Sequence, residues 1–167
     1  LSSKALYREA LKQLKKAKEL ARKFSNHIIL LETLIAERNI ISVMPDKSIS
    51  EMRKQLYEEQ ADALRMLGKN FEYSWLSDQM VICVEQKGDF TDSERSKEMD
   101  KIMQMPLISK DSMAEDLNMK FYQLHTKLFY YLGKNELINV KLLLEKEIEL
   151  LEDNRHFIDH NPKNYSS

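Results

Sequence analysis

Two histidines near the C-terminus, His156 and His160, have a spacing that suits a metal site. On one helix, side chains four residues apart share a face, so both could reach a single zinc ion. A zinc site needs a third and usually a fourth ligand, and no HExxH motif supplies them here. We therefore predict no metal site, and a metal-dependent helical enzyme that uses these two histidines stays open as an alternative.

The single cysteine, Cys83, is the other candidate for chemistry. It lies between Ile82 and Val84 in an apolar segment, where burial would raise the pKa of the thiol and make it a poor nucleophile. No glycine-rich phosphate loop or other catalytic motif is present in the sequence. We expect no catalytic residue and no cofactor. One cysteine cannot form an internal disulfide, so we also expect a reducing, cytoplasmic location.

Charge balance and the length of the apolar runs argue against two classes of partner. Among 167 residues, 26 are Lys or Arg and 27 are Asp or Glu, whereas nucleic-acid-binding domains usually carry a basic excess. No apolar run approaches the roughly 20 residues that span a bilayer. We expect neither nucleic acid nor membrane as a partner.

The lysines between Lys12 and Lys23 form a basic stripe, which we interpret as a solvated helix face. The chain begins at Leu1 without an initiator methionine, and we expect it to be a piece of a larger protein.

The elements that would position any site are helices. Only three Gly and three Pro are present, too few for the turns of a β-rich fold. Apolar residues recur at spacings of three and four, which predicts amphipathic helices. We expect an all-α chain of about seven helices whose short connections make neighbours antiparallel, with a compact helical bundle as the structural alternative. The predicted helices span residues 3–25, 27–43, 48–68, 71–87, 91–105, 110–132 and 135–152.

Local signals set these boundaries. Asn26 is a candidate N-cap, and Pro45 breaks the second helix. The segment Gly68-Lys69-Asn70 has the composition of a helix C-terminus and predicts a turn. The helix that follows, 71–87, is apolar on all sides, so we expect it to be the most buried. The segment Gly133-Lys134-Asn135 predicts the last turn.

The spacing of the turns indicates a repeat. The turns within successive helix pairs fall near Ala5, Pro45, Gly88 and Gly133, which are 40, 43 and 45 residues apart. A nearly constant period of this size is typical of an array with one helical hairpin per unit.

Particular residues in these units resemble the tetratricopeptide (TPR) repeat. Tyr7-Arg8-Glu9-Ala10, continuing to Leu14 and Ala17, fits the turn aromatic and both small positions, and Gly88-Asp89-Phe90 fits the turn. The first helix is also similar to TPR-like segments of bacterial proteins. The resemblance implies an α-α superhelix of stacked hairpins, forming a single domain over residues 1–160 with a tail at 161–167.

In TPR proteins, the first helix of each pair lines a concave groove that binds a peptide or a partner helix. The resemblance therefore implies a protein-binding scaffold whose partner and oligomeric state the sequence leaves open. It implies no carboxylate clamp, because Ile35 and Leu124 stand where the clamp needs basic residues. A regulatory domain that closes on a small signalling peptide stays open as an alternative. The groove residues that the resemblance implies are Glu32, Asn39, Trp75, Asp78, Gln79, Lys120, Gln123, Lys127 and Tyr130.

Overall fold

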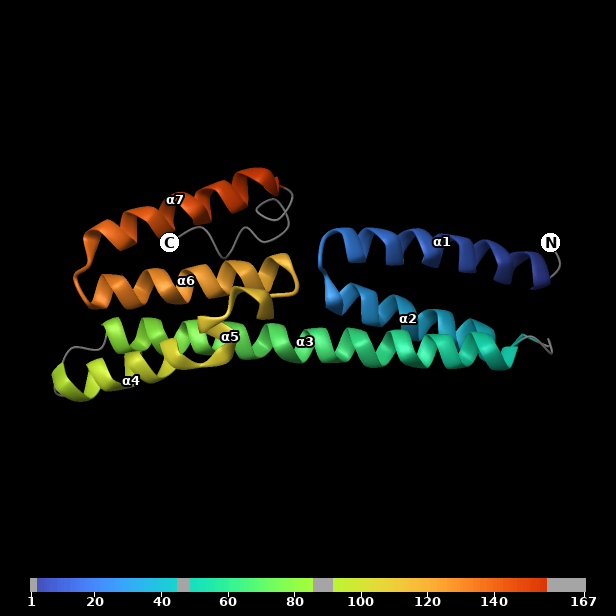
Figure 1. Ribbon diagram of the computed structural model, residues 1–167. Coiled ribbons are helices and arrows are strands. Elements are labelled where there is room, and N and C mark those ends of the chain that lie inside the picture. The colour runs from blue at the N-terminus through green and yellow to red at the C-terminus, as the bar shows by residue number, and fades with distance from the viewer. Residues whose placement is uncertain (1–2, 45–48, 86–91, 156–167) are drawn as a thin grey trace. The chain divides into compact units, whose positions relative to one another are not determined.

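A computed structural model describes residues 3–44, 49–85 and 92–155 of the chain (Figure 1). Throughout these residues the regular elements are helices, which confirms the all-α prediction. The elements are α1 (Ser3–Lys23), α2 (His27–Ser42), α3 (Ile49–Glu85), α4 (Asp92–Gln104), α5 (Pro106–Ser109), the short 3-10 helix η1 (Asp111–Met113), α6 (Leu117–Gly133) and α7 (Leu137–Asp153).

The chain divides into two compact units, and the division falls within α3. Unit 1 is Leu1–Gly68 and unit 2 is Lys69–Ser167. Each unit is described below by itself. The single domain that the sequence predicts over residues 1–160 stays a prediction.

The predicted turn at Gly68–Asn70 is wrong, because α3 continues through it as one helix of 37 residues. A glycine inside a helix costs only about 1 kcal/mol relative to alanine, and the neighbouring turns of helix can outweigh that cost. Gly68 is exposed, and a Cβ added to it would meet nothing within 4 Å. The residue is therefore an ordinary helical position here and not a C-terminal cap.

The predicted helix at 110–132 is also wrong in its first turns. The chain forms α5 and η1 before α6 begins at Leu117. Pro106 occupies the first turn of α5, where its missing N–H is harmless. The Asp116 carboxylate accepts a hydrogen bond from the backbone N–H of Met119 at 2.9 Å, and this N-cap fixes the start of α6.

The same turn closes two helical hairpins, α1–α2 in unit 1 and α6–α7 in unit 2. Ser25 has φ 51° and Asn135 has φ 59°, both in the left-handed region. After each of them, the next backbone N–H bonds back to the carbonyl five residues earlier, as in a Schellman motif. In the first hairpin, Asn26 also caps α2 by accepting from the Ile29 N–H at 3.1 Å, as predicted. The paired helices lie side by side and antiparallel (Figure 1).

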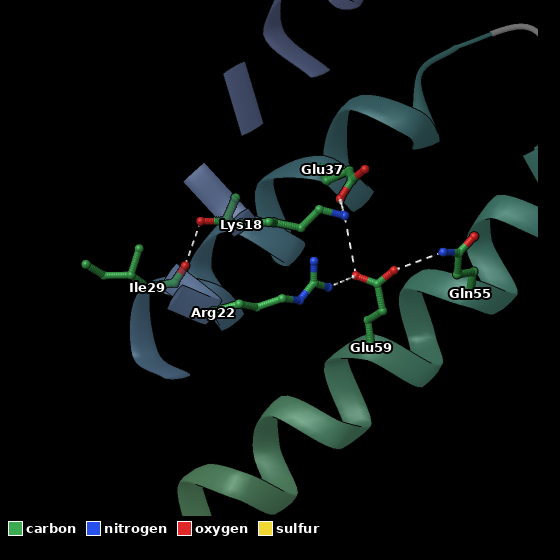
Figure 2. Close-up of polar contacts among 7 residues, drawn as sticks. Lys18, Arg22, Ile29, Glu37, Gln55 and Glu59 are labelled. Carbon is green, nitrogen blue, oxygen red and sulfur yellow. Dashed lines mark hydrogen bonds and ion pairs between the residues drawn. The ribbon is translucent and has the colours of Figure 1, made fainter. Parts of the chain in front are cut away.

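Unit 1 is held by a small apolar core and a charged cluster. The core residues are Ala21, Leu30, Leu34, Ile41, Leu56 and Ala63, with Leu11 packed against them. In the cluster, Lys18 Nζ lies 2.5 Å from Glu37 Oε2 and 3.4 Å from Glu59 Oε2 (Figure 2). Arg22 Nη2 lies 2.7 Å from the same Glu59 oxygen. Two cationic side chains of α1 thus pair with one carboxylate of α3. The interpretation of the basic stripe as a solvated face is therefore wrong for Lys18, which is buried.

Unit 2 is built around α6. On one side α6 contacts α4 and α5, and on another it pairs with α7. Its core also takes one face of α3. The buried apolar residues of the unit include Tyr73, Leu76, Met80, Cys83, Met99, Ile102, Ile108, Met119, Phe121 and Leu128.

Candidate protein-binding surface

Three large apolar side chains are exposed along one face of α3 in unit 2. Phe71 is 70% exposed, Trp75 54% and Ile82 39%. Their spacing of four and seven residues places them on the same side of a helix. The opposite side of this part of α3 carries Tyr73 and Met80, both fully buried. The prediction that residues 71–87 form the most buried helix is therefore wrong for the described part, 71–85, because only one face is covered.

This exposed face, which we call the α3 surface, is acidic at its edges. It comprises Phe71, Trp75 and Ile82 with the exposed acids Glu72, Asp78 and Glu85. No lysine or arginine occurs between residues 70 and 85. Exposed apolar side chains of this size with a charged rim are typical of sites that bind other proteins.

The α3 surface is anchored to the start of α6 by polar contacts. Asn70 Nδ2 donates to Asp116 Oδ2 at 2.8 Å, and Lys69 forms an ion pair with Glu115. Asp116 therefore caps α6 and also accepts a hydrogen bond from Asn70 of α3. Burial, assisted by the Glu115 and Asp116 carboxylates, raises the pKa of the Tyr73 phenol. These contacts join α3 to the start of α6.

Of the other α3 residues that the sequence implies for the groove, Asp78 belongs to this surface and Gln79 lies beside it. Asp78 is exposed and Gln79 is half-buried. Burial, assisted by the Asp78 carboxylate, raises the pKa of Tyr122 on α6.

The α6 residues implied for the groove make contacts inside unit 2. Gln123 is buried, and its Nε2 donates to the Leu107 carbonyl at 2.6 Å and to the Lys110 carbonyl at 3.0 Å. Lys127 Nζ lies 2.6 Å from Asp111 Oδ1, and this hydrogen bond lowers the pKa of Asp111. Both side chains tie α6 to the segment between α4 and α6.

Tyr130 is also engaged, at the other end of α6. Its hydroxyl donates to Asp100 Oδ1 at 2.8 Å, and Lys134 Nζ lies 2.8 Å from the same oxygen. Burial and the hydrogen bond to Asp100 raise the pKa of Tyr130 to about 12. The hydrogen bonds from Lys134 and Tyr130 lower the pKa of Asp100. These three groups therefore join α6 to α4.

The remaining implied residues do not share this neighbourhood. Lys120 is exposed on α6, and Glu32 and Asn39 are exposed on α2 of unit 1. The structure thus brings together Trp75, Asp78 and Gln79, and a groove formed by all nine residues stays a prediction. Sequence reasoning missed Phe71, Glu72 and Glu85 as surface residues. Their signal was the spacing of Phe71, Trp75 and Ile82 on one helical face, together with the lack of basic residues around them.

The groups that could do other chemistry are placed as follows. Cys83 is buried, as predicted, and burial raises the pKa of its thiol. Among residues 3–44, 49–85 and 92–155, no group of three His, Cys, Asp or Glu side chains could hold a metal ion. His156 and His160 lie outside these residues. Nor do the described helices include one that is long and apolar enough to span a bilayer.

Comparisons with known proteins give no match: no family model, no curated protein and no solved structure is similar to this chain.

Proposed function

We propose that this chain is a protein-binding module and that the α3 surface receives a basic, amphipathic segment of a partner protein. The observation that carries the proposal is the exposure of Phe71, Trp75 and Ile82 in one row on a helix whose other face is buried. Tryptophan is enriched among the residues that dominate binding energy, because it buries a large rigid surface at a small cost in entropy.

The charge of the α3 surface selects the class of partner. Glu72, Asp78 and Glu85 are exposed acids, and residues 71–85 of α3 include no lysine or arginine. A partner with lysine or arginine beside its apolar residues would gain complementary charge and faster association, whereas an acidic partner would be repelled. An amphipathic helix carries both features on neighbouring faces, which is how helices dock on apolar surfaces.

The wider architecture belongs to the same proposal. A TPR-like array, a scaffold role without catalysis and a cytoplasmic location are consistent with the helical hairpins α1–α2 and α6–α7 and with a single buried cysteine.

The proposal is tested by isothermal titration of the full chain with two designed helical peptides. The peptides share their apolar residues and differ only in carrying lysine or glutamate at the polar positions. We expect the lysine peptide to bind more tightly by at least about tenfold at low salt, and less so as salt screens the charges. Asp78→Lys combined with Glu85→Lys should invert the preference.

The apolar part of the surface is tested with a matched pair of variants. Trp75→Ala should weaken binding of the lysine peptide by about tenfold or more. Leu64→Ala, on the same helix but in unit 1, removes a side chain with the same 54% exposure and should leave binding unchanged. Equal binding of the two peptides, or equal losses in the two variants, would show that the α3 surface is not the site.

A further inference from the structure

Five residues of the α3 surface have the spacing of a coiled-coil seam. Phe71, Trp75, Asp78, Ile82 and Glu85 are all exposed, and they follow one another at intervals of four, three, four and three residues. This alternation is that of the a and d positions of a heptad, which line the contact between two paired helices. We call these five residues the α3 seam.

The α3 seam lies on the outer side of the helix. Each residue turns a helix by about 100°, which places Tyr73 and Met80 on the side opposite the seam, and both are fully buried. Leu76, Ser77 and Cys83 are the other buried residues of positions 71–85, and none of them is a seam position. The seam is therefore turned away from the core of its own unit.

Two acids of the α3 surface differ in position from the third. Asp78 and Glu85 are seam positions on either side of Ile82, whereas Glu72 lies beside the seam. A seam residue is covered when a partner helix packs on it, and a covered carboxylate is unfavourable unless a cation pairs with it. Polar residues within a coiled-coil seam also determine which partner and which register are accepted. Asp78 and Glu85 therefore select the individual residues that face them, in addition to the overall charge of the partner.

We propose that the partner is a helix with a heptad pattern whose own seam carries lysine or arginine opposite Asp78 and Glu85, and large apolar residues opposite the other three positions. This pattern rests on the proposed function of the α3 surface and adds where the basic residues of the partner lie. The aliphatic stem of lysine or arginine covers apolar neighbours such as Ile82 while its charged end reaches a carboxylate. Along α3, the partner thus presents apolar, apolar, basic, apolar and basic residues in that order.

Two helical peptides of identical composition test this pattern by isothermal titration of the full chain. In the seam peptide, lysine occupies the two seam positions that face Asp78 and Glu85, and leucine occupies the other three. In the flank peptide, these two lysines exchange places with two leucines outside the seam, so that the net charge is the same. Each peptide is made in forward and reversed order, because the pattern fits α3 in either direction, and the tighter order of each is compared. We expect the seam peptide to bind the wild type at least about tenfold more tightly.

A matched pair of variants shows whether the seam acid causes this preference. Asp78→Leu removes an exposed acid within the seam and should abolish most of the preference for the seam peptide. Glu72→Leu removes an exposed acid beside the seam and should keep the preference of the wild type. Circular dichroism first verifies that both variants keep the helical content of the wild type.

The outcomes separate this pattern from the proposed function on which it rests. Equal binding of both peptides to the wild type, with Trp75→Ala weakening both, would overturn the α3 seam and leave the α3 surface as the binding site. A preference that survives in Asp78→Leu would also overturn the seam. Binding of both peptides that Trp75→Ala leaves unchanged would overturn the seam and the proposed function together.

Discussion

Lys18 Nζ of α1 lies 2.5 Å from Glu37 Oε2 of α2, and the two side chains are only 10% and 14% exposed. A charge in such a place is tolerated when it is paired, because desolvation of a lone charge is costly. The pair therefore links the two helices of the first hairpin, and Glu59 of α3 gives Lys18 a second carboxylate partner.

Removal of one member of this pair should destabilise unit 1. Lys18→Met leaves the Glu37 carboxylate buried without this cation, so we expect the free energy of unfolding to fall by about 3 kcal/mol. Lys15→Met removes an exposed lysine from the same helix and should change it by less than about 0.5 kcal/mol. Urea unfolding followed by circular dichroism measures both. Equal stabilities of the two variants would show that the pair contributes nothing.

Gly68 and Gly133 form a second matched pair. A Cβ at Gly68 meets open space in a continuous helix, so Gly68→Ala should stabilise the chain by about 0.5–1 kcal/mol. A Cβ at Gly133 would press against the Met99 methyl and lie 3.0 Å from Val84 Cγ2, so Gly133→Ala should stabilise less or destabilise. Thermal unfolding compares the two. Destabilisation by Gly68→Ala would instead support a turn at this residue.

The contact between Asp100 and Lys134 predicts a dependence on pH. The lowered pKa of Asp100 means that the folded state favours the carboxylate more than the unfolded state does. This stabilisation is present above the ordinary aspartate pKa of about 4 and is lost as the pH falls through the lowered value. Asp100→Asn should therefore be less stable than the wild type at pH 7, and the difference should vanish in acid. Because the Asp100 side chain is 41% exposed, we expect less than about 1 kcal/mol. A difference that persists in acid would point to lost packing instead.

Substitution of Gln123 distinguishes a role in holding unit 2 together from a role in binding the partner. Gln123→Leu removes the donor of two hydrogen bonds to the Leu107 and Lys110 carbonyls, which should cost about 1–3 kcal/mol. Amide hydrogen exchange in residues 105–113 should accelerate, because this segment loses its connection to α6. Binding of the lysine peptide should be unchanged. Weakened binding with unaltered exchange would mean that Gln123 contacts the partner, as the TPR resemblance implies.

Much of the fold was predictable because it depends on local signals. The apolar spacing, the Asn26 cap and the turn before Leu137 act within a few residues, and the helices around them form where expected. The continuity of α3 through Gly68 was not predictable, since the penalty of one glycine is smaller than the gain from neighbouring turns. The start of α6 depends on Asp116, whose carboxylate also binds Asn70 at a distance of 46 residues in sequence.

The candidate site was predictable only in part. Trp75 and Asp78 are implied by the TPR resemblance, but their exposure depends on which face of α3 packs, and apolar residues occur on both faces. The contacts of Gln123, Lys127 and Tyr130 are made with residues that lie 13 to 30 positions away in sequence. Such contacts are set by tertiary packing, which the residue types alone do not encode.

The most direct test of the central claim uses Trp75 as the reporter, because it is the only tryptophan of the chain. The intrinsic fluorescence of the full chain would be recorded during titration with the lysine peptide, with acrylamide as a quencher. If the α3 surface binds the peptide, the emission should shift to the blue and become protected from acrylamide, and both changes should saturate together. Peptide binding detected by calorimetry while the emission and the quenching of Trp75 stay unchanged would contradict the account.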